Sequence, residues 1–253
     1  MRSKRDATHA PDAELQVKIW GIHAVEAALR NPLRTIRRLR LTDNARNRMK
    51  DAIAGRNVTP EQANPRDLDI ELGRDTVHQG ALLETMALPD ITIEDLAPEP
   101  GQLPFVVVLD QVTDPHNAGA ILRSAAAFGA RALVMTARNS PPLDGALAKA
   151  ASGGLELVPV AIVTNLARAM EQLAEAGYFR IGLAGDAENV LEKQRITTPI
   201  ALVLGAEDTG LRRLTREHCD VVCKISTASA LASLNVSNAA AVAMHALAGQ
   251  RHQ

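Results

Sequence analysis

Short apolar runs alternate with helical patterns from Phe105 onward, and this alternation restricts the fold more than any other feature of the chain. Each run has the length and the continuous apolar character of a strand that is buried on both faces. Strands are expected at 105–109, 132–136, 155–160, 179–184, 200–204 and 221–225, and helices at 118–128, 143–151, 165–176, 188–194 and from about 236 onward. The pattern predicts an α/β fold with a mostly parallel sheet that is covered by helices on both faces.

A smaller α/β unit is expected before this region. It has predicted helices at 23–30, 44–54 and 65–72 and predicted strands at 36–41, around Val58 and at 81–86. Residues 89–103 are rich in proline, which interrupts regular structure, and are predicted to be a linker. Residues 1–15 are polar and lack periodicity, which predicts a disordered tail. The expected domains are therefore 16–88 and 104–253.

Charge is distributed unevenly along a chain whose formal net charge is only −1. Residues 1–80 hold 15 basic against 11 acidic side chains, and nine basic residues lie between Arg30 and Arg56. Such a segment favours contact with a polyanion, and Arg37, Arg38 and Arg40 of the expected strand are the candidates for binding RNA phosphates. The alternative is a basic face that is simply solvated. Because aromatic residues make up only 2% of the chain, base stacking on an aromatic platform is not expected.

The two cysteines and the hydropathy of the chain bear on its location. Cys219 and Cys223 have no second cysteine pair and no histidine pair at the spacing of a zinc site, so no metal is expected. Two thiols in a chain of this size fit a reducing compartment. No apolar stretch reaches the roughly 18–20 residues of a membrane span, and the polar N-terminus does not resemble a signal peptide. The sequence predicts a cytoplasmic protein without a membrane partner.

Polar residues interrupt the apolar pattern just after the expected strand at 105–109. Asn117 lies where a helix cap is expected, so capping alone would explain it. Arg123 is the only charge in the expected helix 118–128. If both faces of that helix are covered, its guanidinium should reach a carboxylate, a phosphate or a ligand. The alternative is an arginine that extends to the surface.

Two further polar stretches lie near the C-terminus. Gly205-x-Glu207-x-x-Gly210 follows the expected strand at 200–204, and glycines around an acid suit a turn whose backbone approaches a ligand. The alternative is that Glu207 is a solvated acid near the N-terminus of the following helix. Ser233-Leu234-Asn235-Val236-Ser237-Asn238 opens the last helix with more polar side chains than one cap needs. All three stretches follow strands or precede helices, which is where open α/β sheets bind ligands. We expect them to form the active site.

Common cofactor and catalytic motifs are absent from the sequence. There is no G-x-G-x-x-G after a strand, no G-x-x-x-x-G-K-[ST] and no G-x-S-x-G. The missing glycine fingerprint argues against a nicotinamide-dependent oxidoreductase on the same α/β pattern.

Three stretches in this order are similar to the three motifs of the SpoU/TrmH-type RNA 2′-O-methyltransferases of the SPOUT superfamily: N-x-G-x2-L/I-R, L-G-x-E-x-x-G and S-L-N-V-S. The resemblance covers about Phe105 to the C-terminus. The N-terminal stretch from Trp20 to Leu29 and Val77-His78-Gln79-Gly80 also resemble the family's L30e-like substrate-binding domain. The likeness is greatest to the bacterial 23S rRNA guanosine-2′-O-methyltransferases.

The resemblance implies a deep C-terminal trefoil knot, S-adenosylmethionine as the cofactor, and a homodimer in which both chains contribute to the site. The catalytic set that it implies is Asn117, Arg123, Glu207, Ser233 and Asn235. The implied cofactor-binding set is Leu204, Gly205, Ile225, Ser226 and Leu234.

Guanidinium stays protonated above pH 12, so we expect Arg123 to bind the target phosphate or 2′-oxygen, with Glu207 orienting it, rather than to act as the base. The expected substrate is 23S rRNA or a ribosomal assembly intermediate. The alternatives are tRNA as the substrate, or a noncatalytic RNA-binding or ribosome-assembly factor.

Overall fold

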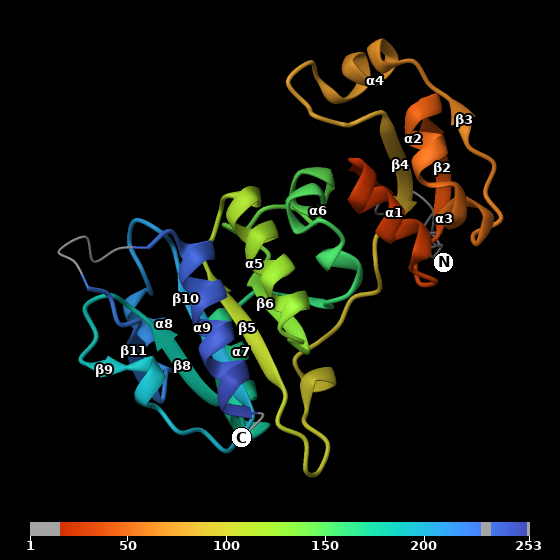
Figure 1. Ribbon diagram of the computed structural model, residues 1–253. Coiled ribbons are helices and arrows are strands. Elements are labelled where there is room, and N and C mark those ends of the chain that lie inside the picture. The colour runs from red at the N-terminus through yellow and green to blue at the C-terminus, as the bar shows by residue number, and fades with distance from the viewer. Residues whose placement is uncertain (1–15, 229–233, 252–253) are drawn as a thin grey trace, which may run out of the picture.

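The structure, a computed structural model, describes residues 16–228 and 234–251 (Figure 1). The predicted tail 1–15 lies outside the described residues. Within the described ranges no helix is long and apolar enough to cross a membrane.

The N-terminal unit is a four-stranded sheet with short helices around it. Its strands lie in the order β1-β4-β2-β3; β4 is antiparallel to β1 and β2, whereas β3 is parallel to β2. The elements are β1 (Gln16–Trp20), α1 (Ile22–Arg30), β2 (Ile36–Leu41), α2 (Asp43–Arg48), α3 (Lys50–Ala54), β3 (Glu61–Gln62), α4 (Pro65–Leu72) and β4 (Ala81–Met86). A short helix, η1 (Glu94–Leu96), lies in the segment that leads to the second unit.

The C-terminal unit is a seven-stranded parallel sheet in the order β7-β6-β5-β10-β8-β11-β9. Its strands are β5 (Phe105–Asp110), β6 (Ala132–Thr136), β7 (Val160–Val163), β8 (Phe179–Leu183), β9 (Asn189–Val190), β10 (Ile200–Gly205) and β11 (Val221–Lys224). Its helices are α5 (Pro115–Ala127), α6 (Gly145–Ala151), η2 (Gly154–Glu156), α7 (Leu166–Glu175), η3 (Leu191–Lys193), α8 (Arg213–Glu217) and α9 (Val236–Arg251). The predicted fold class, a helix-covered parallel sheet preceded by a small α/β unit, is confirmed.

Both faces of the central strands are buried, which explains why β5 and β10 are apolar at every position but the ends. Along β5, Val107 and Leu109 point into one apolar core, which they share with α5, α6 and α9. Val106 and Val108 point into a second core, which they share with α7. Side chains of successive strand residues point to opposite faces, so one continuous apolar run supplies both cores.

The segment that precedes β5 packs against the parallel sheet, unlike a linker without tertiary contacts. Ile93 and Leu96 are buried in the second core, and the Tyr178 hydroxyl donates a hydrogen bond to the Leu96 carbonyl oxygen at 2.6 Å. The proline-rich composition predicts irregular backbone correctly, but the two apolar side chains fasten this segment to the sheet.

Several predicted elements are wrong in extent or type. Residues 155–160 were expected as a strand, but η2 occupies their start and β7 begins only at Val160. Gly153, at a φ of 99°, permits the tight turn, and Pro159 has no N–H for a strand ladder. The strand expected around Val58 instead begins at Glu61.

Other differences concern helices and edge strands. The helix expected at 44–54 is divided into α2 and α3 at Met49, whose ψ of 18° departs from the helical region. The expected helix at 188–194 is a two-residue strand followed by η3, and β1 and α8 are elements that the sequence analysis did not predict.

The order of strands requires a long crossover. β10 pairs with β5 on one side and β8 on the other, so the last but one strand of the chain lies at the centre of the sheet.

The deep trefoil knot implied by the family resemblance concerns how the chain passes through its own loops, and it stays a prediction.

The two units are joined by a buried ion pair as well as by the connecting chain. The Arg34 guanidinium donates to both oxygens of Glu156 at 2.9–3.1 Å, and the two side chains are only 2% and 4% exposed. Asn31 donates to Glu156 Oε2 at 2.7 Å, and Arg34 Nη1 donates to the Met86 carbonyl oxygen at 3.1 Å. Nearby, a Cβ on Gly145 of α6 would overlap the Trp20 ring, so the indole lies directly on that helix.

Candidate active site

Three side chains from distant parts of the sequence meet at the carboxyl edge of the parallel sheet. The Asn117 side-chain amide donates to Glu207 Oε2 at 3.2 Å. The Asn235 amide donates to the same oxygen at 3.2 Å and to Asn117 Oδ1 at 3.0 Å. The three motifs of the sequence therefore converge into one hydrogen-bonded cluster, which we call the Asn-Glu-Asn cluster.

Asn117 is free for this role because another residue caps its helix. α5 begins at Pro115, and the Asp114 side chain accepts a hydrogen bond from the His116 amide at 3.0 Å. The expected start at residue 118, with Asn117 as the possible cap, is therefore wrong. Proline at the first helical position and aspartate before it are favourable start residues.

Glu207 is presented by a tight hairpin that follows β10. Ala206 and Gly210 exchange two backbone hydrogen bonds of 3.1 and 2.9 Å, and Gly210 has a φ of 65°. A Cβ on Gly205 would overlap the Gly210 backbone, so only glycine fits at the base of the hairpin. The spacing of the glycines around Glu207 is thus required by the turn itself.

Asn235 is oriented by the first turn of α9. Its side-chain oxygen accepts hydrogen bonds from the Ser237 amide at 2.9 Å and the Ser237 hydroxyl at 2.6 Å. Those bonds turn its NH2 group toward Asn117 and Glu207. Ser233, which was predicted beside it as a catalytic residue, lies outside the described residues.

Arg123 is not part of the Asn-Glu-Asn cluster. It lies on α5 and is exposed, as are His116 one way along the helix and Ala127 the other. Within the described parts of the chain, no hydrogen bond or ion pair joins Arg123 to a partner. In the single chain Arg123 thus matches the alternative of an arginine that extends to the surface, and Glu207 contacts two amides rather than the guanidinium.

The predicted cofactor-binding residues lie around the same edge. Leu204 is buried at the end of β10 and Gly205 follows it; Ile225 is half-buried just beyond β11. Ser226 is exposed, and its backbone amide donates to Glu192 Oε1 at 3.1 Å. Leu234 exposes 43% of its surface just before α9. These five residues offer backbone groups beside half-buried or exposed apolar side chains, and none of the five is basic. Such surroundings suit an adenosyl group, so the residues fit S-adenosylmethionine.

A buried carboxylate supports the Glu207 hairpin from behind. Asp110, fully buried at the end of β5, accepts hydrogen bonds from the Arg212 amide at 3.0 Å and from Arg212 Nε at 2.6 Å. This pair ties the chain after Gly210 to the neighbouring strand. Sequence reasoning missed it, although an acid ending an otherwise apolar strand was a visible signal.

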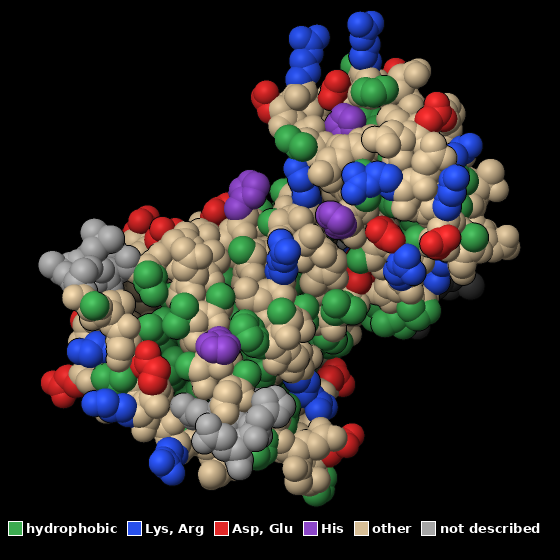
Figure 2. All heavy atoms as spheres, in the orientation of Figure 1, with side chains coloured by type: hydrophobic (Ala, Val, Ile, Leu, Met, Phe, Trp, Pro, Cys, Tyr) green, Lys and Arg blue, Asp and Glu red, His purple; other side chains and the backbone are tan. Residues whose placement is uncertain are grey.

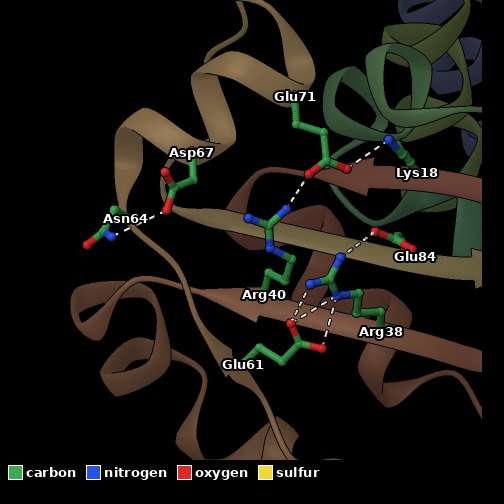
Figure 3. A network of polar contacts seen from close by, with 8 residues as sticks. All are labelled: Lys18, Arg38, Arg40, Glu61, Asn64, Asp67, Glu71 and Glu84. Carbon is green, nitrogen blue, oxygen red and sulfur yellow. Dashed lines mark hydrogen bonds and ion pairs between the residues drawn. The ribbon is translucent and has the colours of Figure 1, made fainter.

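The predicted RNA-binding arginines of β2 have different surroundings (Figure 3). Arg38 makes a two-oxygen contact with Glu61 at 2.6–2.9 Å and lies 3.8 Å from Glu84. The hydrogen bond from Arg38 lowers the pKa of the Glu61 carboxyl. Arg40 pairs with Glu71, which also accepts a hydrogen bond from Lys18 at 2.7 Å.

Arg37 is the exception on this strand. It is exposed at a bulge, because the pairing of β2 with β4 shifts between Ile36 and Arg38. Arg38 and Arg40 would have to leave carboxylates to reach RNA phosphates, whereas Arg37 has no partner within the described residues. A role in RNA binding stays a prediction for all three.

The thiols show no sign of activation. Burial raises the pKa of Cys219 to about 12 and also raises the pKa of Cys223. No group of three or more histidine, cysteine, aspartate or glutamate residues suited to a metal ion lies within the described ranges.

The fold and the cluster define an α/β protein with a small-ligand site at the carboxyl edge of its parallel sheet. The SpoU rRNA Methylase family matches residues 104–245, and the family described as RNA 2′-O ribose methyltransferase substrate binding matches residues 18–90. The chain belongs to the SpoU rRNA methylase family.

Relatives and solved structures resemble almost the whole chain. The 23S rRNA (guanosine-2′-O-)-methyltransferase RlmB of Pseudomonas putida is 38% identical over 92% of this chain and 96% of its own. The protein of the same name from Escherichia coli is 38% identical over 92% of this chain and 98% of its own. The crystal structure of the SpoU methyltransferase AviRb from Streptomyces viridochromogenes in complex with the cofactor AdoMet is 25% identical, with a TM-score of 0.78, over 94% of this chain and 91% of that one.

Proposed function

We propose that this chain transfers the methyl group of S-adenosylmethionine to the ribose 2′-hydroxyl of a guanosine in 23S rRNA. The observation that carries the proposal is the Asn-Glu-Asn cluster, because it places the three motifs of the family at one edge of the sheet. Relatives with this activity match 92% of the chain, including the N-terminal unit.

Each part of the chain has a proposed task. Residues 16–88 bind the RNA, 89–103 connect the two domains, and 104–253 carry out the transfer. Because the substrate is ribosomal RNA, we place the protein in the cytoplasm. The proposed catalytic set is Asn117, Arg123, Glu207, Ser233 and Asn235, and the proposed cofactor-binding set is Leu204, Gly205, Ile225, Ser226 and Leu234.

When bound, the cofactor supplies a methyl carbon that is already electrophilic. The task of the chain is to align the 2′-hydroxyl behind that carbon, and alignment can lower the barrier by several kcal/mol. The hydroxyl proton leaves late in the transfer and passes to solvent water. The two amides fix Glu207 through Oε2 and leave Oε1 available to a substrate hydroxyl or to a guanidinium. Arg123 binds the phosphate or 2′-oxygen of the target nucleotide.

A homodimer would complete the site. The exposed residues of α5 and α9 include Ala127 and Val242, which is 43% exposed, beside polar residues such as His116 and His245, and hydrophobic side chains gather over these helices in Figure 2. A second copy seated there would bring Arg123 close to the partner chain.

Light scattering should give the mass of a dimer, and Val242→Arg should give monomers that no longer transfer methyl groups. An active wild-type monomer would refute this arrangement.

Methyl transfer to purified 23S rRNA tests the function, with donor binding measured by calorimetry. Arg123→Ala should lower transfer on the order of 100-fold or more while leaving donor affinity nearly unchanged. Glu207→Gln should also lower transfer, whereas the control Arg195→Ala, which changes an exposed arginine between η3 and β10 that belongs to neither proposed set, should behave as wild type. Full activity of Arg123→Ala would show that the assigned role is wrong.

Transfer to tRNA is the second candidate. A structure described as a TrmH/SpoU tRNA modifying enzyme from A. aeolicus has a TM-score of 0.54 and covers only 60% of this chain. The match of the N-terminal unit in the relatives named for 23S rRNA favours rRNA. Parallel assays with 23S rRNA and tRNA, followed by mapping of 2′-O-methyl groups in cells that lack the protein, distinguish the two.

A further inference from the structure

The N-terminal unit has a cavity of about 560 Å³ that the methyl-transfer chemistry does not use. It opens where the start of α1, the start of α2, the end of β3 and the turn before β4 come together. Its volume lies within the range of about 300–1,000 Å³ that is typical of small-ligand sites. We call it the N-terminal cavity.

The lining of this cavity combines an apolar floor with an amide-rich rim. Ile22, Ala63 and Gly80 are buried and form the floor. The rim carries four exposed carboxamides, from Asn44, Gln62, Asn64 and Gln79. The Asn64 NH2 group donates to Asp67 at 3.3 Å, whereas the Asn44 and Gln62 amides have no partner within the described residues. A carboxamide offers both donors and an acceptor, which is the pattern that matches the edge of a nucleobase, and an apolar floor suits its flat face.

Two features hold this lining in place. Gln79 has a φ of 56°, unusual for a residue other than glycine, and its Oε1 accepts a hydrogen bond from the Ile22 amide at 3.0 Å. Thr42 donates its amide to the Gly80 carbonyl at 2.9 Å, and a Cβ on Gly80 would overlap the Thr42 side chain. The turn at Gln79 and Gly80 is therefore held against the start of α1 and against Thr42.

The arginine beside the cavity differs from Arg38 and Arg40 of β2 in its ion pairing. Arg48 lines the cavity, is exposed, and has no hydrogen-bond or ion-pair partner within the described residues. Arg38 and Arg40, in contrast, are engaged with carboxylates (Figure 3). Asp43 adds an acceptor at the rim, which suits the N–H groups of a base.

We propose that the N-terminal cavity binds an unpaired nucleobase of the RNA and that Arg48 contacts the adjoining phosphate. The inference rests on the proposed function and adds to it a feature of the substrate, an unstacked nucleotide other than the one that is methylated. Proteins read RNA sequence mainly in loops and bulges, where bases are accessible to side chains, and a cavity of this kind would be unused by a continuous duplex.

Binding of two RNA fragments tests the proposal: a 23S rRNA fragment with an unpaired loop, and a duplex of the same length. The variant Asn44→Ala/Gln62→Ala removes two rim amides that are exposed, so thermal unfolding should be unchanged. It should bind the loop fragment about tenfold or more weakly and the duplex as wild type does. Gln102→Ala, which removes an exposed amide outside the cavity, is the matched control.

Steady-state kinetics separate this proposal from the proposed function. In the double variant the KM for RNA should rise while kcat at saturating RNA stays unchanged, and Arg48→Ala should raise KM more than Arg195→Ala. Equal losses on loop and duplex RNA, or no loss at all, would overturn the cavity assignment while wild-type transfer stands. If the wild type transferred no methyl group to any RNA, the proposed function would fail, yet the loop preference would still test the cavity.

Discussion

Glu156→Ala is expected to separate the two domains, because it removes the acceptor of the most buried ion pair in the described structure. Glu156 and Arg34 are 4% and 2% exposed, and three hydrogen bonds of 2.9–3.1 Å join them. Without the carboxylate, a desolvated guanidinium remains at the seam with only the Met86 carbonyl as partner. Breaking a buried pair from one side costs about 3–5 kcal/mol, a large part of the roughly 5–15 kcal/mol that stabilises a protein.

Trp20 provides the assay, since it is the only tryptophan of the chain and lies on Gly145 across the seam. In urea, Glu156→Ala should show a fluorescence change at lower concentration than the loss of circular dichroism. The wild type should show both changes together. The melting temperature should fall by about 6–20 °C, given about 2–4 °C per kcal/mol for a chain of this size.

Glu26→Ala is the matched control. Its partner Arg30 lies one helical turn away at 2.9 Å, with side chains that are 30% and 58% exposed, and an exposed pair of this type contributes about 0.3–0.5 kcal/mol. A second variant, Arg34→Met/Glu156→Leu, removes both charges and should recover most of the stability. If Glu156→Ala were no more harmful than Glu26→Ala, the ion pair would not hold the domains together.

Three other variants or reagents give direct checks. Gly145→Ala should push the Trp20 ring away from α6 and shift its emission to the red without unfolding either domain, and unchanged emission would contradict the contact. Because burial raises the pKa of Cys219 to about 12, iodoacetamide should modify this thiol slowly at pH 7.5 in the native protein and quickly in urea, as mass spectrometry would show. Hydrogen bonds to the Leu214 carbonyl and to Glu171 raise the pKa of His218 above its usual value of 6.5. The contribution of His218 to stability should therefore be complete below about pH 6.5 and lost as the pH rises through the higher folded-state pKa. His218→Gln should lower the free energy of unfolding at pH 5.5 but not at pH 9. An equal effect at both pH values would exclude the linkage.

The sequence predicted that the three polar stretches meet, because their position depends on local rules; it did not predict which side chains of those stretches bond to one another. Carboxyl ends of parallel strands and amino ends of the following helices share one edge, so residues at those places come together wherever the strands lie in the sheet. The strand order, by contrast, depends on pairing between segments far apart in the chain, which periodicity does not encode. The same limit applies to the knot, which was expected only from the family resemblance.

Side chains with long-range partners were harder to predict. In the sequence, the basic residues of β2 have no evident partners. In the folded sheet, Arg38 lies opposite Glu84 of β4 and Arg40 opposite Glu61 of β3, and both strands are separated from β2 along the chain. Arg123 was expected to have a partner because its helix is apolar, yet which strip of that helix is covered depends on where α9 packs. The local sequence pattern predicts the helix or strand to which a residue belongs, whereas the neighbours of its side chain depend on tertiary packing.

The central place of β10 also affects how the protein is made. On the ribosome, β5 is complete 90 residues and β8 17 residues before Ile200 is added (from Asp110 and Leu183, respectively), and neither has its shared neighbour until then. Two apolar strands with open edges are prone to associate with other chains, and pairing across a long stretch of sequence is slow. A nascent chain that ends before Gly205 is thus an aggregation hazard, and we expect cells to shield it with chaperones until the middle of the sheet has been filled.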